Sequence, residues 1–199
     1  MGYAIVLFFD QSSCQRVEDL RNSISQAADL PAPGNGRSRP HITIAMFDTL
    51  ENIQPTIRIV DKFSRTVFPV EIKLEFIGWF PTAEGVIFLS PVVTRPLLDV
   101  HDILHRLLDG EGMISHSYYR PGKWVPHCTI AAGLPPPTAN MALNEILRSM
   151  VFGSVTLSEV GLVEFDPIKY LSTFPLVGTH PEVAQTGSMG GRGKSSNTG

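Results

Sequence analysis

Hydrophobic and polar residues along this 199-residue chain follow two spacings, and each spacing predicts a type of secondary structure. Apolar residues alternate with charged ones from Val70 to Phe76, which predicts a half-buried strand. The uninterrupted apolar run from Tyr3 to Phe9 predicts a buried strand that ends at an aspartate. Further strands are expected at residues 86–93, 155–165 and 170–177.

Apolar residues three or four positions apart predict four helices between these strands, because side chains at that spacing share one helix face. The second helix is expected from Asn52 to Ser64, with Pro55 in its first turn, where proline is tolerated. The residues that mark the four helices are Val17, Leu20, Ile24 and Ala27 or Ala28; Ile53, Ile57 and Val60; Leu97, Val100, Leu104 and Leu107; and Leu143, Ile146, Leu147 and Met150.

Two six-residue segments of the chain nearly repeat each other. Pro40–Ala45 reads PHITIA and Pro126–Ala131 reads PHCTIA, so the two are identical at five of six positions. The predicted elements around them run strand, helix, motif strand, helix, strand, and then repeat this order with one extra strand. We therefore expect a duplication of architecture, because the halves share no convincing residue identity beyond the motifs.

The repeated segments also predict where their polar side chains point. Successive side chains of a strand lie on opposite faces, so His41 and Thr43 share one face while Ile42 turns toward the core. The second segment does the same with His127 and Thr129. Placed side by side, two such strands would set two imidazoles and two hydroxyls around one small space. This arrangement is a candidate phosphate site.

Opening a phosphodiester requires one group that accepts a proton from the attacking oxygen and another that donates a proton to the leaving oxygen. One neutral and one protonated imidazole can do both near neutral pH, so His41 and His127 are the expected catalytic pair and no metal is required. The hydroxyls of Thr43 and Thr129 can donate to the non-bridging phosphate oxygens.

With these two motifs, the chain resembles the 2H phosphoesterase superfamily, also called 2′-5′ RNA ligase-like or cyclic phosphodiesterase-like proteins. The motifs that carry the resemblance are His41-Ile42-Thr43 and His127-Cys128-Thr129. It implies an α+β, two-lobed, pseudo-duplicated fold with antiparallel sheets around a central cleft and helices on the outside. It also implies metal-independent chemistry on 2′,3′-cyclic phosphate or 2′-5′ phosphodiester bonds of RNA or nucleotides, and we expect no cofactor. Which histidine is the acid, and whether the enzyme hydrolyses or ligates, stay open.

The stretches that carry basic residues just before the two motifs contain no acidic residue, and aromatic residues accompany the second. The basic residues are Arg37 and Arg39 before the first motif, and Arg120 and Lys123 before the second. Arg39 and Lys123 are candidate phosphate ligands, or else ordinary solvated charges. Trp124, with Tyr119 nearby, is a candidate platform for a nucleotide base, or else packs under its loop.

Two rival interpretations of the sequence remain. The first is a catalytically silent nucleotide or RNA-end binding module of the same fold, although both motifs are intact. The second is a metal hydrolase built on His101 and His105, which lie four residues apart on the third predicted helix. No third ligand is apparent, so we expect these two histidines to lie on an exposed helix face.

Composition limits the kinds of substrate, cellular compartment and domain organisation that we expect. The net charge of −3 argues against a broad nucleic-acid-binding surface, so the expected substrate is an RNA end, a short oligonucleotide or a cyclic nucleotide. Two cysteines and the absence of a long apolar segment favour a cytoplasmic protein without a membrane partner. We expect a monomer with one domain over residues 1–179 and a disordered Gly/Ser-rich tail over residues 180–199.

Overall fold

The structure is a computed structural model of the 199-residue chain, and it describes residues 2–29, 38–81, 85–134 and 136–178. The predicted disordered tail, 180–199, therefore lies outside the described residues. The elements in chain order are β1 (Gly2–Phe9), α1 (Gln11–Ala28), β2 (His41–Phe47), α2 (Ile53–Thr66), β3 (Val70–Phe80), β4 (Val86–Pro91), α3 (Arg95–Gly110), the short 3-10 helix η2 (Ser117–Tyr119), β5 (Cys128–Ala131), α4 (Pro136–Arg148), β6 (Gly153–Phe165) and β7 (Lys169–Pro175).

Each predicted strand and helix is present, with ends shifted by a few residues. The N-terminus of α1 is fixed by the Asp10 carboxylate, which accepts hydrogen bonds from the backbone N–H groups of Ser13 and, on β6, Thr156, both at 3.0 Å. Of the four residues that mark α4, only Ile146 is buried, because α4 packs on α1 along one edge of its apolar stripe. No helix among the described residues is long and apolar enough to cross a membrane.

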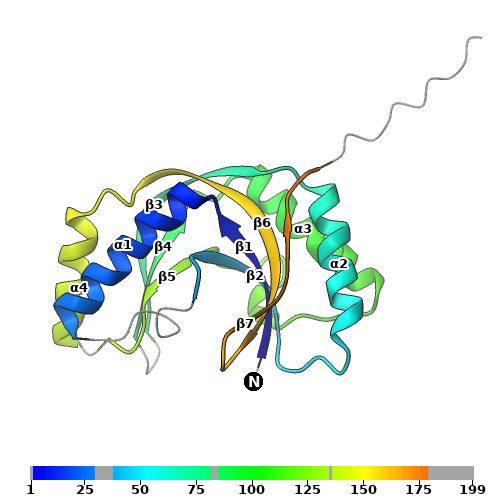
Figure 1. The fold of residues 1–199 in the computed structure, drawn as a ribbon, viewed down its shortest axis with the longest axis horizontal. Helices are drawn as coiled ribbons and strands as arrows, with labels where there is room; N and C mark the ends of the chain where they lie inside the picture. The colour runs from blue at the N-terminus through cyan, green and yellow to red at the C-terminus, as the bar shows by residue number, and fades with distance from the viewer. Residues whose placement is uncertain (1, 30–37, 82–84, 135, 179–199) are drawn as a thin grey trace, which may run out of the picture.

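The strands form one antiparallel sheet in the order β2-β1-β6-β3-β4-β5, with β7 paired to β6. This confirms the predicted α+β class with antiparallel strands, although the two halves share one continuous sheet. The link is β6, whose residues 157–165 pair with β1 while residues 153–157 pair with β3. Figure 1 shows the long β6 arching over the other strands, so the two ends of the sheet approach each other.

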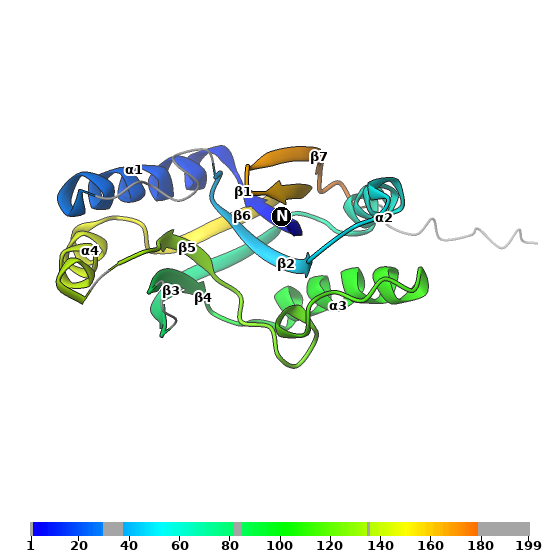
Figure 2. The same cartoon turned by 90° about the horizontal axis from the view of Figure 1, so that it is seen from below.

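The two motif strands, β2 and β5, lie at opposite ends of the strand order but contact each other below the arch. Helices α1 and α4 lie together on one side of them, and α2 and α3 lie together on the other (Figures 1 and 2). The sheet is therefore closed by its curvature and not by hydrogen bonds between β2 and β5.

The core is continuous across both halves. Alternate residues of β1, Ile5, Leu7 and Phe9, enter the main apolar cluster, which also includes residues of β4, β5 and all the long helices. The opposite face of β1 enters a smaller cluster with Val163, and this cluster includes the buried Phe8. The strand is thus buried on both sides, as its uninterrupted apolar sequence predicts.

Candidate active site

Both motif strands contain a β-bulge at the same position of the repeat. The register between β1 and β2 skips Ile44, and the register between β4 and β5 skips Ile130. A bulge adds one residue to a strand and changes the direction of the side chains that follow it. The repeated sequence therefore produces the same irregularity in both halves.

This bulge decides which motif residues face the cleft between β2 and β5. The residues of each motif and the residue just after it that line the cleft are His41, Thr43 and Met46 in the first half and His127, Thr129 and Ala132 in the second. In each half the first two cleft-lining residues are two positions apart, as in a regular strand, but the third follows three positions later, because the bulge adds one residue. The sequence pattern alone predicts the first of these spacings but not the second.

The cleft has a volume of about 630 Å³ and brings together the two histidines and two threonines that the sequence singles out. Its remaining walls come from the β6–β7 turn, from strand residues next to the motifs and from the loops before them. These residues are Ala4, Ser38, Val86, Tyr119, Phe165, Asp166, Pro167 and Ile168. A nucleotide-sized ligand fits a cleft of this volume.

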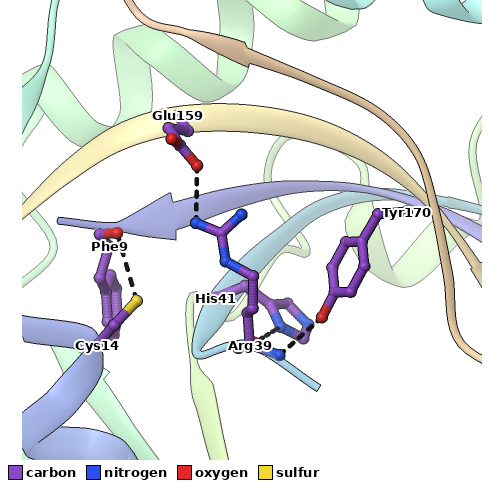
Figure 3. Close-up of polar contacts among 6 residues, drawn as sticks. All are labelled: Phe9, Cys14, Arg39, His41, Glu159 and Tyr170. Atoms are coloured by element: carbon purple, nitrogen blue, oxygen red, sulfur yellow. Dashed lines mark hydrogen bonds and ion pairs between the residues drawn. The ribbon is translucent and has the colours of Figure 1, made fainter. Parts of the chain in front are cut away.

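The two imidazoles are held in the same tautomer by the same contact. In His41, Nδ1–H donates to the carbonyl oxygen of Arg39 at 2.7 Å (Figure 3), and in His127, Nδ1–H donates to the carbonyl oxygen of Val125 at 2.7 Å. Because a carbonyl oxygen can only accept, Nδ1 carries the proton and Nε2 is left to exchange one. Each histidine thus uses the backbone two residues before it as its orienting group.

Burial controls the protonation of both rings. Desolvation and, to a smaller extent, the positive charge of Arg21 lower the pKa of His41 to about 4, against the opposing effect of the Arg39 carbonyl. Desolvation also lowers the pKa of His127, against the opposing effect of the Val125 carbonyl. Both imidazoles are therefore neutral at pH 7 in the absence of an anion.

Aromatic rings lie beside both histidines and contribute to their burial. The His41 ring lies 6.2 Å from that of Phe8 and 6.4 Å from that of Phe165. The His127 ring lies 4.9 Å from Phe80 and 5.2 Å from Phe88, measured between centroids. The two imidazoles thus have equivalent apolar backing, built from different strands.

Arg39 is directed away from the cleft. Its guanidinium pairs with Glu159 on β6 at 2.7 Å and lies 4.1 Å above the Phe8 ring, while its backbone N–H donates to the Tyr170 hydroxyl at 2.8 Å (Figure 3). These contacts fix the backbone whose carbonyl holds His41. A direct phosphate contact from the Arg39 side chain stays a prediction, and Arg37 lies outside the described residues.

In the second loop, Lys123 and Trp124 also do not line the cleft. Lys123 is exposed, and its backbone N–H donates to the Arg120 carbonyl. The Trp124 indole N–H donates to the Thr43 carbonyl at 2.9 Å, and the ring stacks on His101 with centroids 4.1 Å apart. Trp124 therefore packs under its loop, which was one of the two interpretations, and Tyr119 is the loop aromatic that reaches the cleft.

The expectation that His101 and His105 lie on an exposed helix face is wrong. They are only 1% and 2% exposed, because α3 turns them toward the motif strand and the loop before the second motif. Nε2 of His101 hydrogen bonds the Tyr119 carbonyl at 2.8 Å, and Nε2 of His105 hydrogen bonds the Ile44 carbonyl at 3.1 Å. Among the described residues, no group of three or more His, Cys, Asp or Glu is arranged to hold a metal ion.

One residue of the site was missed by the sequence analysis. Arg21 of α1 is 4% exposed and hydrogen bonds the Thr129 and Ser38 carbonyls. The available signal was its position, because Arg21 falls on the same helix face as Val17, Leu20 and Ile24. A charged residue inside an apolar stripe needs buried partners.

The cleft geometry gives the threonines a testable role. Replacing Thr43 or Thr129 by valine keeps the volume but removes a donor from the cleft, and we expect turnover to fall about tenfold in each variant. Steady-state kinetics on the best substrate measure the effect, with Thr173→Val on the exposed face of β7 as the control. Unchanged kinetics in both cleft variants would assign these threonines a role in the strand alone.

Comparison with known proteins identifies the group to which this arrangement belongs. A profile of the 2′-5′ RNA ligase superfamily matches residues 9–167, a range that contains both motifs and most of the sheet. The chain belongs to this superfamily. This match confirms the resemblance to 2H phosphoesterases that the two motifs indicated. A search of curated proteins found no match.

Solved structures show how widely the superfamily fold is shared. The crystal structure of TT0787 of Thermus thermophilus superposes with a TM-score of 0.64 at 19% identity, covering 90% of this chain and 100% of that one. The E. coli protein LigT, crystallised with 3′-AMP, gives a TM-score of 0.58 at 15% identity, covering 87% and 97% of the two chains. LigT crystallised with NADP+ gives 0.56 at 13% identity, with 87% and 96% covered. At these identities the likeness concerns the fold alone.

Proposed function

We propose that this superfamily member is a metal-independent phosphodiesterase that acts on a 2′,3′-cyclic phosphate or a 2′-5′ linkage of RNA or nucleotides. The observation that carries the proposal is the pair of imidazoles in one cleft, each with Nδ1 bonded to a carbonyl and Nε2 left for proton transfer. Membership in a superfamily of phosphoesterases supports this type of enzyme.

Hydrolysis of a cyclic phosphate divides the work between the two rings. The neutral imidazole accepts a proton at Nε2 from water as the new P–O bond forms, and the protonated imidazole donates its Nε2 proton to the ribose oxygen as the old P–O bond breaks. Thr43 and Thr129 donate to the non-bridging oxygens, where negative charge increases. Ligation is the same sequence with a ribose hydroxyl as the nucleophile, and the reverse reaction, cleavage of the 2′-5′ bond, exchanges the roles of the two histidines.

Binding of the substrate prepares this asymmetric protonation. Desolvation disfavours a positive charge on either ring, but a phosphate anion in the cleft favours it and raises the pKa of the imidazole that it contacts. One ring is then protonated while the other stays neutral. Because the apolar surroundings disfavour a charged ring in the free protein, the state with one protonated and one neutral imidazole forms mainly when the substrate phosphate is bound.

The walls of the cleft favour a nucleotide over a bare phosphate ester. Tyr119, Phe165 and Ile168 offer apolar and aromatic surface for a base, while Ser38 and Asp166 offer polar groups for a ribose or an exocyclic amine. LigT, which shares the fold, has been crystallised with 3′-AMP, NADP+ and ATP. We infer that the substrate is a nucleotide or an RNA end.

A catalytically silent binding module of the same fold is the alternative. Both histidines and both threonines are present and line one cleft, which favours turnover. Incubating the purified protein with candidate substrates and measuring both binding and product separates the enzyme from the silent module. The candidates are 2′,3′-cyclic nucleotides, 2′-5′ dinucleotides and RNA with a cyclic phosphate end. Tight binding of one of these compounds without any product would favour the silent module.

The pH dependence follows from the pKa values. Burial lowers the pKa of both imidazoles below the ordinary 6.5, so one ring is protonated and the other neutral only at acidic pH in the free protein. We expect kcat/KM to be bell-shaped with a maximum below pH 6.5, and kcat to peak at a higher pH because bound phosphate raises one pKa. Rates measured from pH 4 to 9 test this, and a monotonic rise with pH would exclude the acid role.

The same series repeated with EDTA tests the metal-independent part of the proposal. Activity should be unchanged, because proton transfer and charge stabilisation are assigned to imidazoles and hydroxyls. Loss of activity with EDTA, restored by zinc or manganese, would support a metal hydrolase instead.

A further inference from the structure

Arg21 is a buried charged residue that hydrogen bonds the backbone in both halves of the site. It enters from α1 and is 4% exposed, with Nε donating to the Thr129 carbonyl at 3.1 Å and Nη1 donating to the Ser38 carbonyl at 2.7 Å. Nη2 also donates to the Thr129 carbonyl and lies 3.9 Å from Sγ of Cys128. One guanidinium therefore contacts both cleft-lining segments.

These contacts join the two halves of the site. Ser38 lies three residues before His41, and Thr129 lies two residues after His127. Both Ser38 and Thr129 line the cleft. Because the guanidinium is planar and rigid, it fixes the distance between the two backbone segments that it bridges. Among the described residues β2 and β5 are not paired as neighbouring strands, so Arg21 is a direct link between β5 and the segment that leads into β2.

The charge of Arg21 is not neutralised by any carboxylate among the described residues. Its partners there are carbonyl oxygens and a thiol, whereas Arg39 pairs with Glu159 and Arg120 pairs with Asp109. Burying a charge without a counter-ion is costly, and an anion nearby offsets the cost. The cleft beside Arg21 is where the proposed function puts a phosphate.

The corresponding helix-to-strand contact in the other half uses a neutral group. His105 of α3 hydrogen bonds the Ile44 carbonyl of β2, so each of these helices supports the motif strand of the opposite half. Desolvation lowers the pKa of His105, so this imidazole is neutral at pH 7. Only the α1 bridge brings a permanent positive charge.

We propose that Arg21 is a positioning residue that holds the two motifs at their working separation and supplies a buried positive charge to the phosphate in the cleft. This inference rests on the proposed function. It makes two separable statements, one about the fork of hydrogen bonds and one about the charge. Two substitutions separate them, because lysine keeps the charge without the fork and glutamine keeps an amide donor without the charge.

Several groups act on His41, and the experiment must isolate Arg21 from them. Arg21 and Arg39 place positive charge near His41, and His127 adds to it when it is protonated. Glu159 pairs with Arg39, and Asp166 lines the cleft. Since the charge of Arg21 lowers the pKa of His41, its removal should raise that pKa. The other groups are unchanged in Arg21 variants.

The test uses the full chain with inorganic phosphate as the probe. Calorimetry gives the Kd for phosphate, and the imidazole proton signals in NMR give the titration of His41. For Arg21→Gln we expect a Kd raised about tenfold or more and a His41 titration at higher pH. For Arg21→Lys we expect a phosphate Kd within about threefold of the wild type, and kcat about tenfold lower because the fork is lost.

The matched control is Arg16→Gln, on the same helix. Arg16 also bonds a backbone carbonyl, that of Ser154 at 2.9 Å, but neither residue lines the cleft. This variant should match the wild type in all three measurements. It controls for loss of a positive charge from α1 and for loss of a carbonyl contact.

Several results would overturn the inference. A folded Arg21→Gln protein with wild-type phosphate affinity and an unshifted His41 titration would eliminate the charge role, as would failure of the wild type to bind phosphate. If Arg21→Gln does not fold, Arg21→Lys decides: weak phosphate binding there, or unchanged kcat, contradicts the proposal. The binding and titration measurements need no turnover, so they distinguish a failure of Arg21 from a failure of the proposed activity.

Discussion

Replacing His41 or His127 by alanine should lower turnover by about 10²-fold or more, because each variant lacks one of the two proton-transfer groups. Folding should survive, since both side chains face the cleft and neither belongs to the main apolar core. Single-turnover rates on the best substrate, with circular dichroism as the check on folding, measure the effect. The exposed His116 provides a control, and His116→Ala should retain full activity.

The double variant refines this expectation. If the two imidazoles act as one unit, His41→Ala/His127→Ala should be only slightly slower than the slower single variant. Rate losses that multiply would indicate independent contributions. Either single variant with near wild-type activity would refute the paired-histidine mechanism.

Replacing Gly78 by alanine should damage both stability and activity, because this glycine leaves room for the ring that backs His127. A Cβ at Gly78 would lie 2.1 Å from Cζ of Phe88. The Phe88 ring is also packed 4.3 Å from the Phe80 ring and 5.2 Å from His127, so it cannot move without displacing one of them. We expect about 1–3 kcal/mol of destabilisation and a loss of turnover approaching 10²-fold from misplacement of the imidazole.

The other half of the molecule contains a similar contact, and α3 supplies a control. A Cβ at Gly161 would lie 2.8 Å from Cε2 of Phe8, the ring beside His41, and 2.8 Å from the Ser172 carbonyl oxygen. Gly161→Ala should therefore behave like Gly78→Ala, whereas Gly110→Ala, with no atom within 4 Å of the new Cβ, should be harmless. Thermal unfolding detects the stability effect, roughly 2–4 °C per kcal/mol for a chain of this size. Wild-type melting temperatures for both Gly78→Ala and Gly161→Ala would contradict the prediction, because the Phe88 and Phe8 rings would then move aside without cost.

Local sequence patterns predicted the elements well because those patterns are themselves the cause of the local structure. The alternation from Val70 to Phe76 is present as the exposed and buried faces of β3, and the stripe of Val17, Leu20 and Ile24 is the buried face of α1. The two motifs also predicted the side chains that meet in the cleft, since a strand fixes which residues share a face.

What the sequence could not predict depends on contacts between distant segments. The strand order puts β2 and β5 at opposite ends of one sheet, and pairing over such separations leaves no local pattern. The direction of a long side chain is equally non-local, so Arg39 pairs with Glu159 on β6 although its position beside His41 suggested a phosphate ligand. His101 and His105 had a usable signal, because they fall on the buried face of α3 with Leu97 and Leu104.

The shared strand β6 has a consequence for how this cleft can open. Leu157 pairs with Phe9 of β1 on one side and with Val70 of β3 on the other, so the two halves meet within one unbroken strand. A hinge needs a few backbone positions that are free to rotate, and a strand hydrogen bonded on both sides offers none. We therefore expect the separation of the imidazoles to change only by twisting of the sheet, so that a ligand enters a cleft of nearly fixed width without a hinge-like closure of the two halves.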